Sequence, residues 1–234
     1  MTSIGSSIIC MDHINFEADV RICEKLGVDY LHLDVMDGLY VPRYGIYPEI
    51  VHRISDITDM KMDLHLMVSD VQFAIQQFGS IENIEYISIH LDDNEKDLLR
   101  YVDIVRKYDK KPGLVINLTS NLRHVADIIK SAELDSIMLM GIHPGVLVQN
   151  PRPDLAINNL QFLTNICETS LPQFIQIDGG VNFDTIPMLC AAGVTNLVCG
   201  SSTLYKDVPC GVDYQKRFVL IQKNFNAIIN KLRT

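Results

Sequence analysis

The feature that most constrains the fold is an alternation of short β-branched runs with longer segments of helical period. The predicted strands end near Ser7, Asp34, Met67, His90, Asn117, Met140, Asp178 and Cys199. Helical patterns lie between or after them, for example Phe16 to Leu26, Glu95 to Tyr108 and Asp184 to Ala192. Eight units in 234 residues give roughly 29 residues each, close to the length of a βαβ unit.

No linker, low-complexity tract or charge run divides these units, so we expect one domain over residues 1–234. Eight units in one domain predict a single (β/α)8 TIM barrel of the α/β class. A doubly wound open sheet would produce much the same alternation.

Strand parity favours the barrel. In "MDLHLMV" the residues Asp63, His65 and Met67 share one face, and in "FIQID" Gln176 and Asp178 do so, while the opposite faces are almost wholly aliphatic. A barrel explains this pattern, because its outer faces lie beneath helices while its inner faces converge on one mouth.

Charge and composition restrict the partners. The formal net charge is −9 and no basic patch is evident, which argues against nucleic acid and against an anionic membrane as partners. An anionic substrate would need local help from helix N-termini or backbone amides.

The cysteines and the N-terminus bear on location. Six cysteines occur without a C-x-x-C spacing, which predicts reduced, buried thiols and a cytoplasmic protein. The N-terminus has no basic region before a long apolar run, and no segment reaches about 18 apolar residues, so we expect a soluble, unexported chain.

Polar side chains at the predicted strand ends suggest a metal site. His32 and Asp34 are two apart on one strand face, roughly 6.6 Å between Cβ atoms, and both can reach one ion. With His65 and Asp178 they make two imidazoles and two carboxylates, a set suited to one Zn²⁺, Fe²⁺, Mn²⁺ or Co²⁺ per chain. Alternatively, each histidine is a hydrogen-bonded core residue. Asp37, before a glycine, is interpreted as a turn residue or helix-entry acceptor.

Two glycine-containing pairs suggest a phosphate site. Gly179-Gly180 follow the seventh predicted strand and Gly200-Ser201 follow the eighth, where barrel loops often present backbone N–H groups to a phosphate. Either pair alone could simply form a tight turn.

These residues together resemble the ribulose-phosphate 3-epimerase family of metal-dependent ketose-phosphate epimerases. The resemblance covers almost the whole chain and is carried by "SSIICMD", "HLDVMDG", "HLMV", "IHLD", "GLVINLT", "IMLMGIHPG", "IDGGV" and "AAGVTNLVCGSS". It implies metal ligands at His32, Asp34, His65 and Asp178. It further implies substrate-binding roles for Ser7, Met36, Met67, Met140, Gly145, Gly179, Gly180, Gly200 and Ser201.

The chain departs from the family pattern in two loops. After Pro144-Gly145 the family usually continues Phe-Gly-Gly-Gln, and this chain has Val146-Leu147-Val148-Gln149. Where the family often reads Asn-Pro-x-Thr-Pro, this chain has Asn117-Leu118-Thr119-Ser120. The first departure bears on the loop that grips phosphate. The "CMD" segment resembles the allulose-6-phosphate branch rather than the ribulose-5-phosphate branch.

The resemblance implies epimerisation at C3 of a phosphorylated ketose by an isomerase, in a chain expected to form a homo-oligomer. Asp34 and Asp178 are the predicted catalytic acid and base, and the metal supplies charge stabilisation to the enediolate. The alternatives are a barrel that binds sugar phosphates without turning them over and a related sugar-phosphate lyase. A lyase or aldolase would expect a lysine near the reacting carbon, and none is predicted at an inward strand end.

Overall fold

The computed structural model describes residues 2–91, 95–146 and 149–233. Within these ranges eight parallel strands close into one barrel, in sequence order, with β8 pairing back to β1. The strands are β1 (Ser3–Ser7), β2 (Tyr30–Met36), β3 (Lys61–Met67), β4 (Ile84–His90), β5 (Lys111–Ile116), β6 (Ser136–Met140), β7 (Phe174–Asp178) and β8 (Asn196–Cys199). The predicted (β/α)8 barrel is therefore confirmed.

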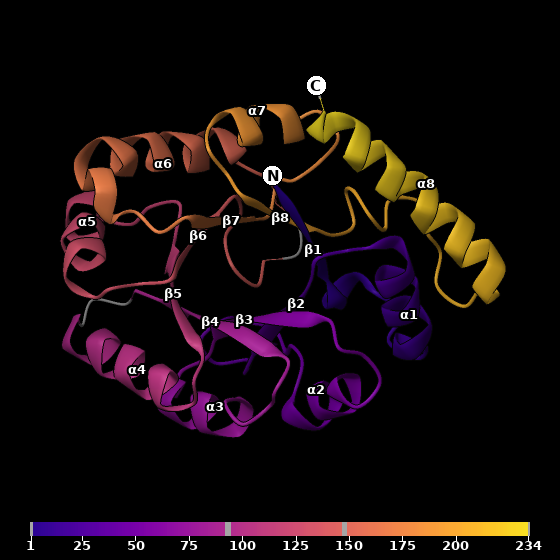
Figure 1. The fold of residues 1–234 in the computed structure, drawn as a ribbon, viewed down its shortest axis with the longest axis horizontal. Coiled ribbons are helices and arrows are strands. Elements are labelled where there is room, and N and C mark those ends of the chain that lie inside the picture. Colours follow the sequence, from indigo (N-terminus) through magenta and orange to yellow (C-terminus); the bar gives the residue numbers. More distant parts are fainter. Residues whose placement is uncertain (1, 92–94, 147–148, 234) are drawn as a thin grey trace.

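A ring of helices surrounds the strands (Figure 1). The α-helices of the described residues are α1 (Phe16–Leu26), α2 (Pro48–Ser55), α3 (Val71–Phe78), α4 (Glu95–Lys107), α5 (Leu122–Ser131), α6 (Pro153–Cys167), α7 (Ile186–Ala191) and α8 (Tyr214–Leu232). Two 3-10 turns, η1 (Ile8–Cys10) and η2 (Glu168–Ser170), follow β1 and α6. The last helix, α8, lies beside α1, which brings the two ends of the chain's helical ring together.

Element ends differ slightly from the sequence prediction, for local reasons. Strand β2 continues past Asp34 because Met36 still pairs with Met67 of β3. Strand β5 stops before Asn117, whose backbone N–H donates to the Ser120 side chain at 3.0 Å and so turns the chain. Helices α4 and α7 are also shorter than their predicted ranges.

The strand pattern explains why the barrel forms. Outward-facing Leu33, Leu64 and Ile87 lie side by side in register on neighbouring strands and are fully buried beneath the helices. Burying such aliphatic side chains on both faces of a sheet is what a parallel barrel does, because each crossover helix covers the outer face.

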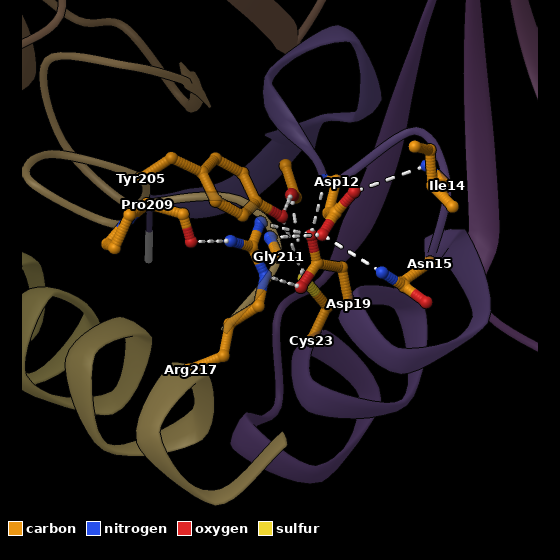
Figure 2. Close-up of polar contacts among 10 residues, drawn as sticks. Asp12, Ile14, Asn15, Asp19, Cys23, Tyr205, Pro209, Gly211 and Arg217 are labelled. Atoms are coloured by element: carbon orange, nitrogen blue, oxygen red, sulfur yellow. Dashed lines mark hydrogen bonds and ion pairs between the residues drawn. The ribbon is translucent and has the colours of Figure 1, made fainter. Parts of the chain in front are cut away.

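A fully buried ion pair joins α1 to α8 where the barrel closes (Figure 2). The Arg217 guanidinium of α8 contacts both carboxylate oxygens of Asp19 in α1 and donates to the Pro209 carbonyl at 2.8 Å. Asp12 extends the network, since its own N–H donates to Asp19 and its carboxylate accepts from the Gly211 N–H at 2.9 Å. We call Asp12, Asp19 and Arg217 the closure cluster.

The cysteines and the helices bear on the environment expected for the chain. All six cysteines are free, and the predicted burial holds for only three of them: Cys23, Cys167 and Cys199 are buried, Cys10 and Cys190 are partly exposed, and Cys210 is exposed. Among the described residues, no helix has both the length and the apolar character needed to span a membrane.

Candidate active site

A cavity of about 590 Å³ opens at the carboxyl ends of the strands. All the residues predicted to bind substrate, and both predicted catalytic carboxylates, line it: Ser7, Asp34, Met36, Met67, Met140, Gly145, Asp178, Gly179, Gly180, Gly200 and Ser201. Barrel enzymes place their active sites at this end of the strands. The structure thus brings together residues that the sequence spreads over nearly its whole length.

Four side chains converge where two of them, Asp34 and Asp178, border this cavity. One ligand-type atom from each of His32, Asp34, His65 and Asp178 lies within 4.8 Å of the others. Asp34 Oδ1 is 3.3 Å from His32 Nε2 and 3.3 Å from His65 Nδ1, and His65 Nδ1 is 3.6 Å from Asp178 Oδ2. We call these four residues the strand-end cluster.

Strand register produces this convergence. In the β2–β3 pair, Asp34 stands directly beside His65, and His32 stands beside Asp63, with all four side chains on the inner face. Asp178 is the last residue of β7, which reaches the same end of the barrel from the far side of β1 and β8. Because side chains alternate along a strand, residues two apart point into the same mouth.

The two histidines each leave one nitrogen without a hydrogen bond. His32 Nδ1 contacts Asp63 Oδ2 at 3.0 Å, and His65 Nε2 contacts His90 Nε2 at 2.8 Å. The other nitrogens, His32 Nε2 and His65 Nδ1, are buried without hydrogen-bonding geometry, although Asp34 Oδ1 lies 3.3 Å from each. Buried polar atoms without partners are costly. Two imidazole nitrogens and two carboxylates aimed at one point form a donor set that fits a divalent transition metal.

The charges of the cluster favour one another. Burial alone would lower the pKa of His32, but the carboxylates of Asp63 and Asp34 outweigh it and hold that pKa well above its usual value. Burial is likewise outweighed at His65, whose pKa is raised by Asp178 and Asp34. Burial opposes ionisation of Asp34 as well, yet the two imidazoles lower its pKa. The opposite charges of the two imidazoles and the carboxylates therefore stabilise one another.

A supporting layer behind the cluster was given no role by the sequence analysis. Asp63 Oδ2 accepts from both His32 Nδ1 and Gln176 Nε2, and Asp63 is fully buried. Burial and the neighbouring His65 hold the pKa of His90 well below its usual value, so its ring is neutral. Strand parity had placed Asp63 and Gln176 on inner faces, and His90 was predicted as the end of a strand. That parity was the available signal, but it does not reveal which atoms meet.

Three methionine side chains form part of the cavity wall. Met36, Met67 and Met140 are each buried and line the cavity. Ser7 stands on the β1 side, where its hydroxyl donates to Asp34 Oδ2 at 3.4 Å. A flexible thioether offers no exchangeable proton to the space it encloses.

The glycine-containing loops also border the cavity. Gly179 and Gly180 both have positive φ, +87° and +75°, a region that other residues rarely adopt. A side chain at Gly200 would approach Cys10 Sγ to 3.1 Å. The backbone conformation therefore favours glycine at positions 179 and 180, whereas at Gly200 a side chain would require Cys10 to shift.

The departing loop begins at Gly145, which has φ +71° and lies against Val41. Val146 is exposed and lines the cavity together with Gln149. Leu147 and Val148, the residues of the predicted departure, lie outside the described residues. Asp37, in contrast, is confirmed as a turn residue, because its carboxylate accepts from the N–H groups of Leu39, Tyr40 and Ser69.

The fold and site together define a TIM-barrel enzyme. Solved structures of low identity share the fold alone: a mutant tryptophan synthase alpha-subunit from Pyrococcus furiosus matches with a TM-score of 0.70 at 13% identity, over 98% of both chains. A phosphoribosylanthranilate isomerase from Thermotoga maritima matches with a TM-score of 0.61 at 14% identity, covering 100% of this chain and 99% of that one.

The particular family is set by sequence. The model of the ribulose-phosphate 3-epimerase family matches residues 3–204, so the chain belongs to that family of carbohydrate epimerases within the isomerase class. The ribulose-phosphate 3-epimerase of Methanocaldococcus jannaschii is 28% identical over 207 residues, 88% of this chain and 86% of that protein. Ribulose-phosphate 3-epimerase 1 of Cupriavidus necator is 30% identical over 203 residues, 85% of this chain and 83% of that protein.

Proposed function

We propose that the protein is a metal-dependent 3-epimerase of a ketose phosphate. The substrate pair is of the ribulose-5-phosphate/xylulose-5-phosphate type or of the allulose-6-phosphate/fructose-6-phosphate type. The observation that carries the proposal is the strand-end cluster, whose two imidazole nitrogens without hydrogen bonds lie beside two carboxylates that line a cavity bordered by glycine-containing loops.

One divalent metal ion (Zn²⁺, Fe²⁺, Mn²⁺ or Co²⁺) would be held by His32, Asp34, His65 and Asp178. When bound, the ion supplies positive charge that stabilises an enediolate derived from the ketose. Asp63 and His90 support the histidines from behind, since each engages the ring nitrogen that faces away from the cluster.

Proton transfer is the work of Asp34 and Asp178. Both carboxylates line the cavity, and they reach it from different strands, β2 and β7. One carboxylate takes the proton as the C3–H bond breaks, and the electron pair passes into the enediolate. The other carboxylate, as the acid, returns a proton to the opposite face of C3, which inverts that centre. The reverse reaction exchanges the two roles.

The remaining cavity residues bind and shield the substrate. Met36, Met67 and Met140 exclude water from the reacting carbon, and Ser7 offers a hydroxyl beside Asp34. The amides of Gly179-Gly180 and Gly200-Ser201 are proposed to hold the phosphate. Homo-oligomerisation and a cytoplasmic location are predictions from the amino-acid sequence and do not depend on this chemistry.

The test is solvent exchange at C3. Purified protein in D₂O is given a panel of pentulose and hexulose phosphates, and proton NMR follows loss of the C3 proton signal and formation of the epimer. We expect deuterium at C3 of one ketose phosphate. Binding without exchange would instead identify a silent sugar-phosphate-binding barrel, and cleavage of the carbon chain would identify a lyase.

A further inference from the structure

The active-site cavity contains a basic residue that the epimerase chemistry leaves unused. Arg43 is the one Lys or Arg among the described residues that line the cavity, which the carboxylates Asp34 and Asp178 also line. Its guanidinium makes no hydrogen bond or ion pair with any described residue, and it is half-buried. A partly buried guanidinium with five unused donors beside a substrate cavity is suited to an anion.

The loop that carries Arg43 is fastened to the strand-end cluster. The N–H groups of Gly45 and Ile46 donate to the carbonyls of Met36 and Asp34, at 3.0 and 2.9 Å. Gly45 permits this approach, because a Cβ there would lie 2.2 Å from the Asp34 carbonyl oxygen. The loop therefore runs directly along the end of β2.

The other end of the loop is also held. The Asp37 carboxylate accepts from two amides of its own loop and from Ser69 N at 2.7 Å. Asp37 and Tyr44 form an isolated antiparallel bridge across the loop. A loop anchored at both ends loses little conformational freedom when its side chain binds a ligand.

The neighbours of Arg43 place it near the glycine-containing loops. Arg43 also lines a second cavity, of about 270 Å³, with Ile8 and Ile9 from the turn that follows β1. Gly200, after β8, lies against Cys10 of that same turn. Arg43 thus borders the β1–β8 side of the mouth, where Gly200 and Ser201 line the cavity.

We propose that Arg43 binds the phosphate group of the substrate and thereby favours phosphorylated over unphosphorylated ketoses. The proposal rests on the proposed epimerase function for the identity of the substrate. A chain of net charge −9 with two carboxylates in the cavity gains most from a fixed cation there, because a guanidinium can bind two phosphate oxygens at once.

The first arm of the test measures binding of inorganic phosphate by calorimetry and does not depend on turnover. Arg43→Met should weaken binding by about 10- to 100-fold, the range for a lost charge-assisted hydrogen bond. Arg43→Lys should weaken it less, because the charge remains while the bidentate geometry is lost. The control is Arg53→Met: Arg53 is an exposed residue of α2 that pairs with Asp56 and lines neither cavity. Its phosphate affinity should match that of the wild type.

The second arm measures kinetics. For Arg43→Met, the loss in kcat/KM on the phosphorylated ketose should exceed the loss on the unphosphorylated ketose at least tenfold, with metal content and circular dichroism unchanged. Phosphate binding that is as tight in Arg43→Met as in the wild type, or equal kinetic losses on both sugars, would overturn the proposal. Absence of epimerisation by the wild type would instead remove the proposed function, and the phosphate arm would still decide the role of Arg43.

Discussion

The strand-end cluster and the closure cluster are both buried groups of opposite charges, yet they differ in how their atoms are partnered. In the closure cluster the Arg217 guanidinium is bound by both oxygens of Asp19 and by the Pro209 carbonyl (Figure 2). In the strand-end cluster, His32 Nε2 and His65 Nδ1 lack hydrogen bonds. The closure cluster therefore partners its own charged atoms, whereas the strand-end cluster leaves two imidazole nitrogens available to a ligand.

This difference in partnering distinguishes a buried charged group that stabilises the fold from one that can bind a ligand. A buried ion pair in which every guanidinium nitrogen and carboxylate oxygen has a partner holds two elements together and has little left to offer a substrate. Buried atoms left unpaired lower stability unless a bound species completes them. Buried charge is therefore a weak indicator of an active site, whereas unpaired buried atoms that converge beside a cavity are a strong one.

We expect the largest effect from a substitution within the strand-end cluster. Asp178→Asn should slow turnover by about 10²- to 10⁴-fold, the usual contribution of a general acid or base, while the free energy of unfolding stays close to that of the wild type. The measurement is a steady-state assay on the ketose phosphate, with metal content determined on the same sample because the change also alters a proposed ligand. A fully metallated variant with near-normal turnover would contradict the acid-base role.

The closure cluster should respond in the opposite way. Arg217→Met leaves Asp19 buried without its partner, which should cost about 3–5 kcal/mol of stability, while the folded fraction retains its metal affinity. Urea denaturation measures the first effect and metal titration the second. In the double variant Asp19→Leu with Arg217→Met much of the loss should be recovered, since no uncompensated charge remains. A single variant as stable as the wild type would show that the ion pair contributes nothing.

Asp63, which lies behind the strand-end cluster, extends the comparison. Its carboxylate is hydrogen-bonded, and it supports a histidine whose other ring nitrogen has no hydrogen bond. Asp63→Asn should lower metal affinity by about 10- to 100-fold, because His32 loses the carboxylate that fixes its ring nitrogen. Competition with a chelator measures the metal affinity. His65→Ala, which removes a proposed ligand, should show the lowest metal affinity of the series.

A matched control for this prediction comes from the same inner barrel face. Ser136 is buried, and its hydroxyl forms no hydrogen bond with the strand-end cluster or with any other described residue. Ser136→Ala should leave metal affinity unchanged. Equal losses in Asp63→Asn and Ser136→Ala would mean that inner-face polarity in general, rather than the His32 contact, sets the affinity.

The sequence predicted the barrel and the composition of the strand-end cluster because both depend on local periodicity. Period-two alternation shows which face His32, Asp34 and His65 occupy, and strand ends in a barrel share one mouth. The free nitrogens were not predictable, since the contact of His32 with Asp63 depends on the register between two strands.

Longer-range features were also beyond the sequence. Gln176 reaches Asp63 across the barrel from β7, and Arg217 meets Asp19 only after the whole barrel has closed. The sequence does not distinguish Arg43 from the other basic residues. Its position beside the cavity depends on the packing of Gly45 on β2. Such contacts are set by tertiary geometry, which periodicity does not encode.

The smallest expected effect concerns Asp12, at the edge of the closure cluster. The N–H of Gly211 and the side-chain amide of Asn15 donate to its carboxylate and lower its pKa below the usual value. A carboxyl group with a lowered pKa in the folded state adds stability that is complete above its unfolded-state pKa, about 3.9, and is lost as the pH falls through the folded-state pKa.

Asp12→Asn should therefore cost about 1 kcal/mol at neutral pH, the net worth of one or two hydrogen bonds, and the gap to the wild type should narrow as the pH falls below about 4. Urea denaturation of both proteins at several pH values measures it. Asp56→Asn, at an exposed ion pair with Arg53, serves as control and should show a small difference. A gap that stays constant or widens in acid would show that Asp12 acts through its shape rather than its charge. The closure cluster would then depend on the Asp19–Arg217 pair alone for its electrostatic stabilisation.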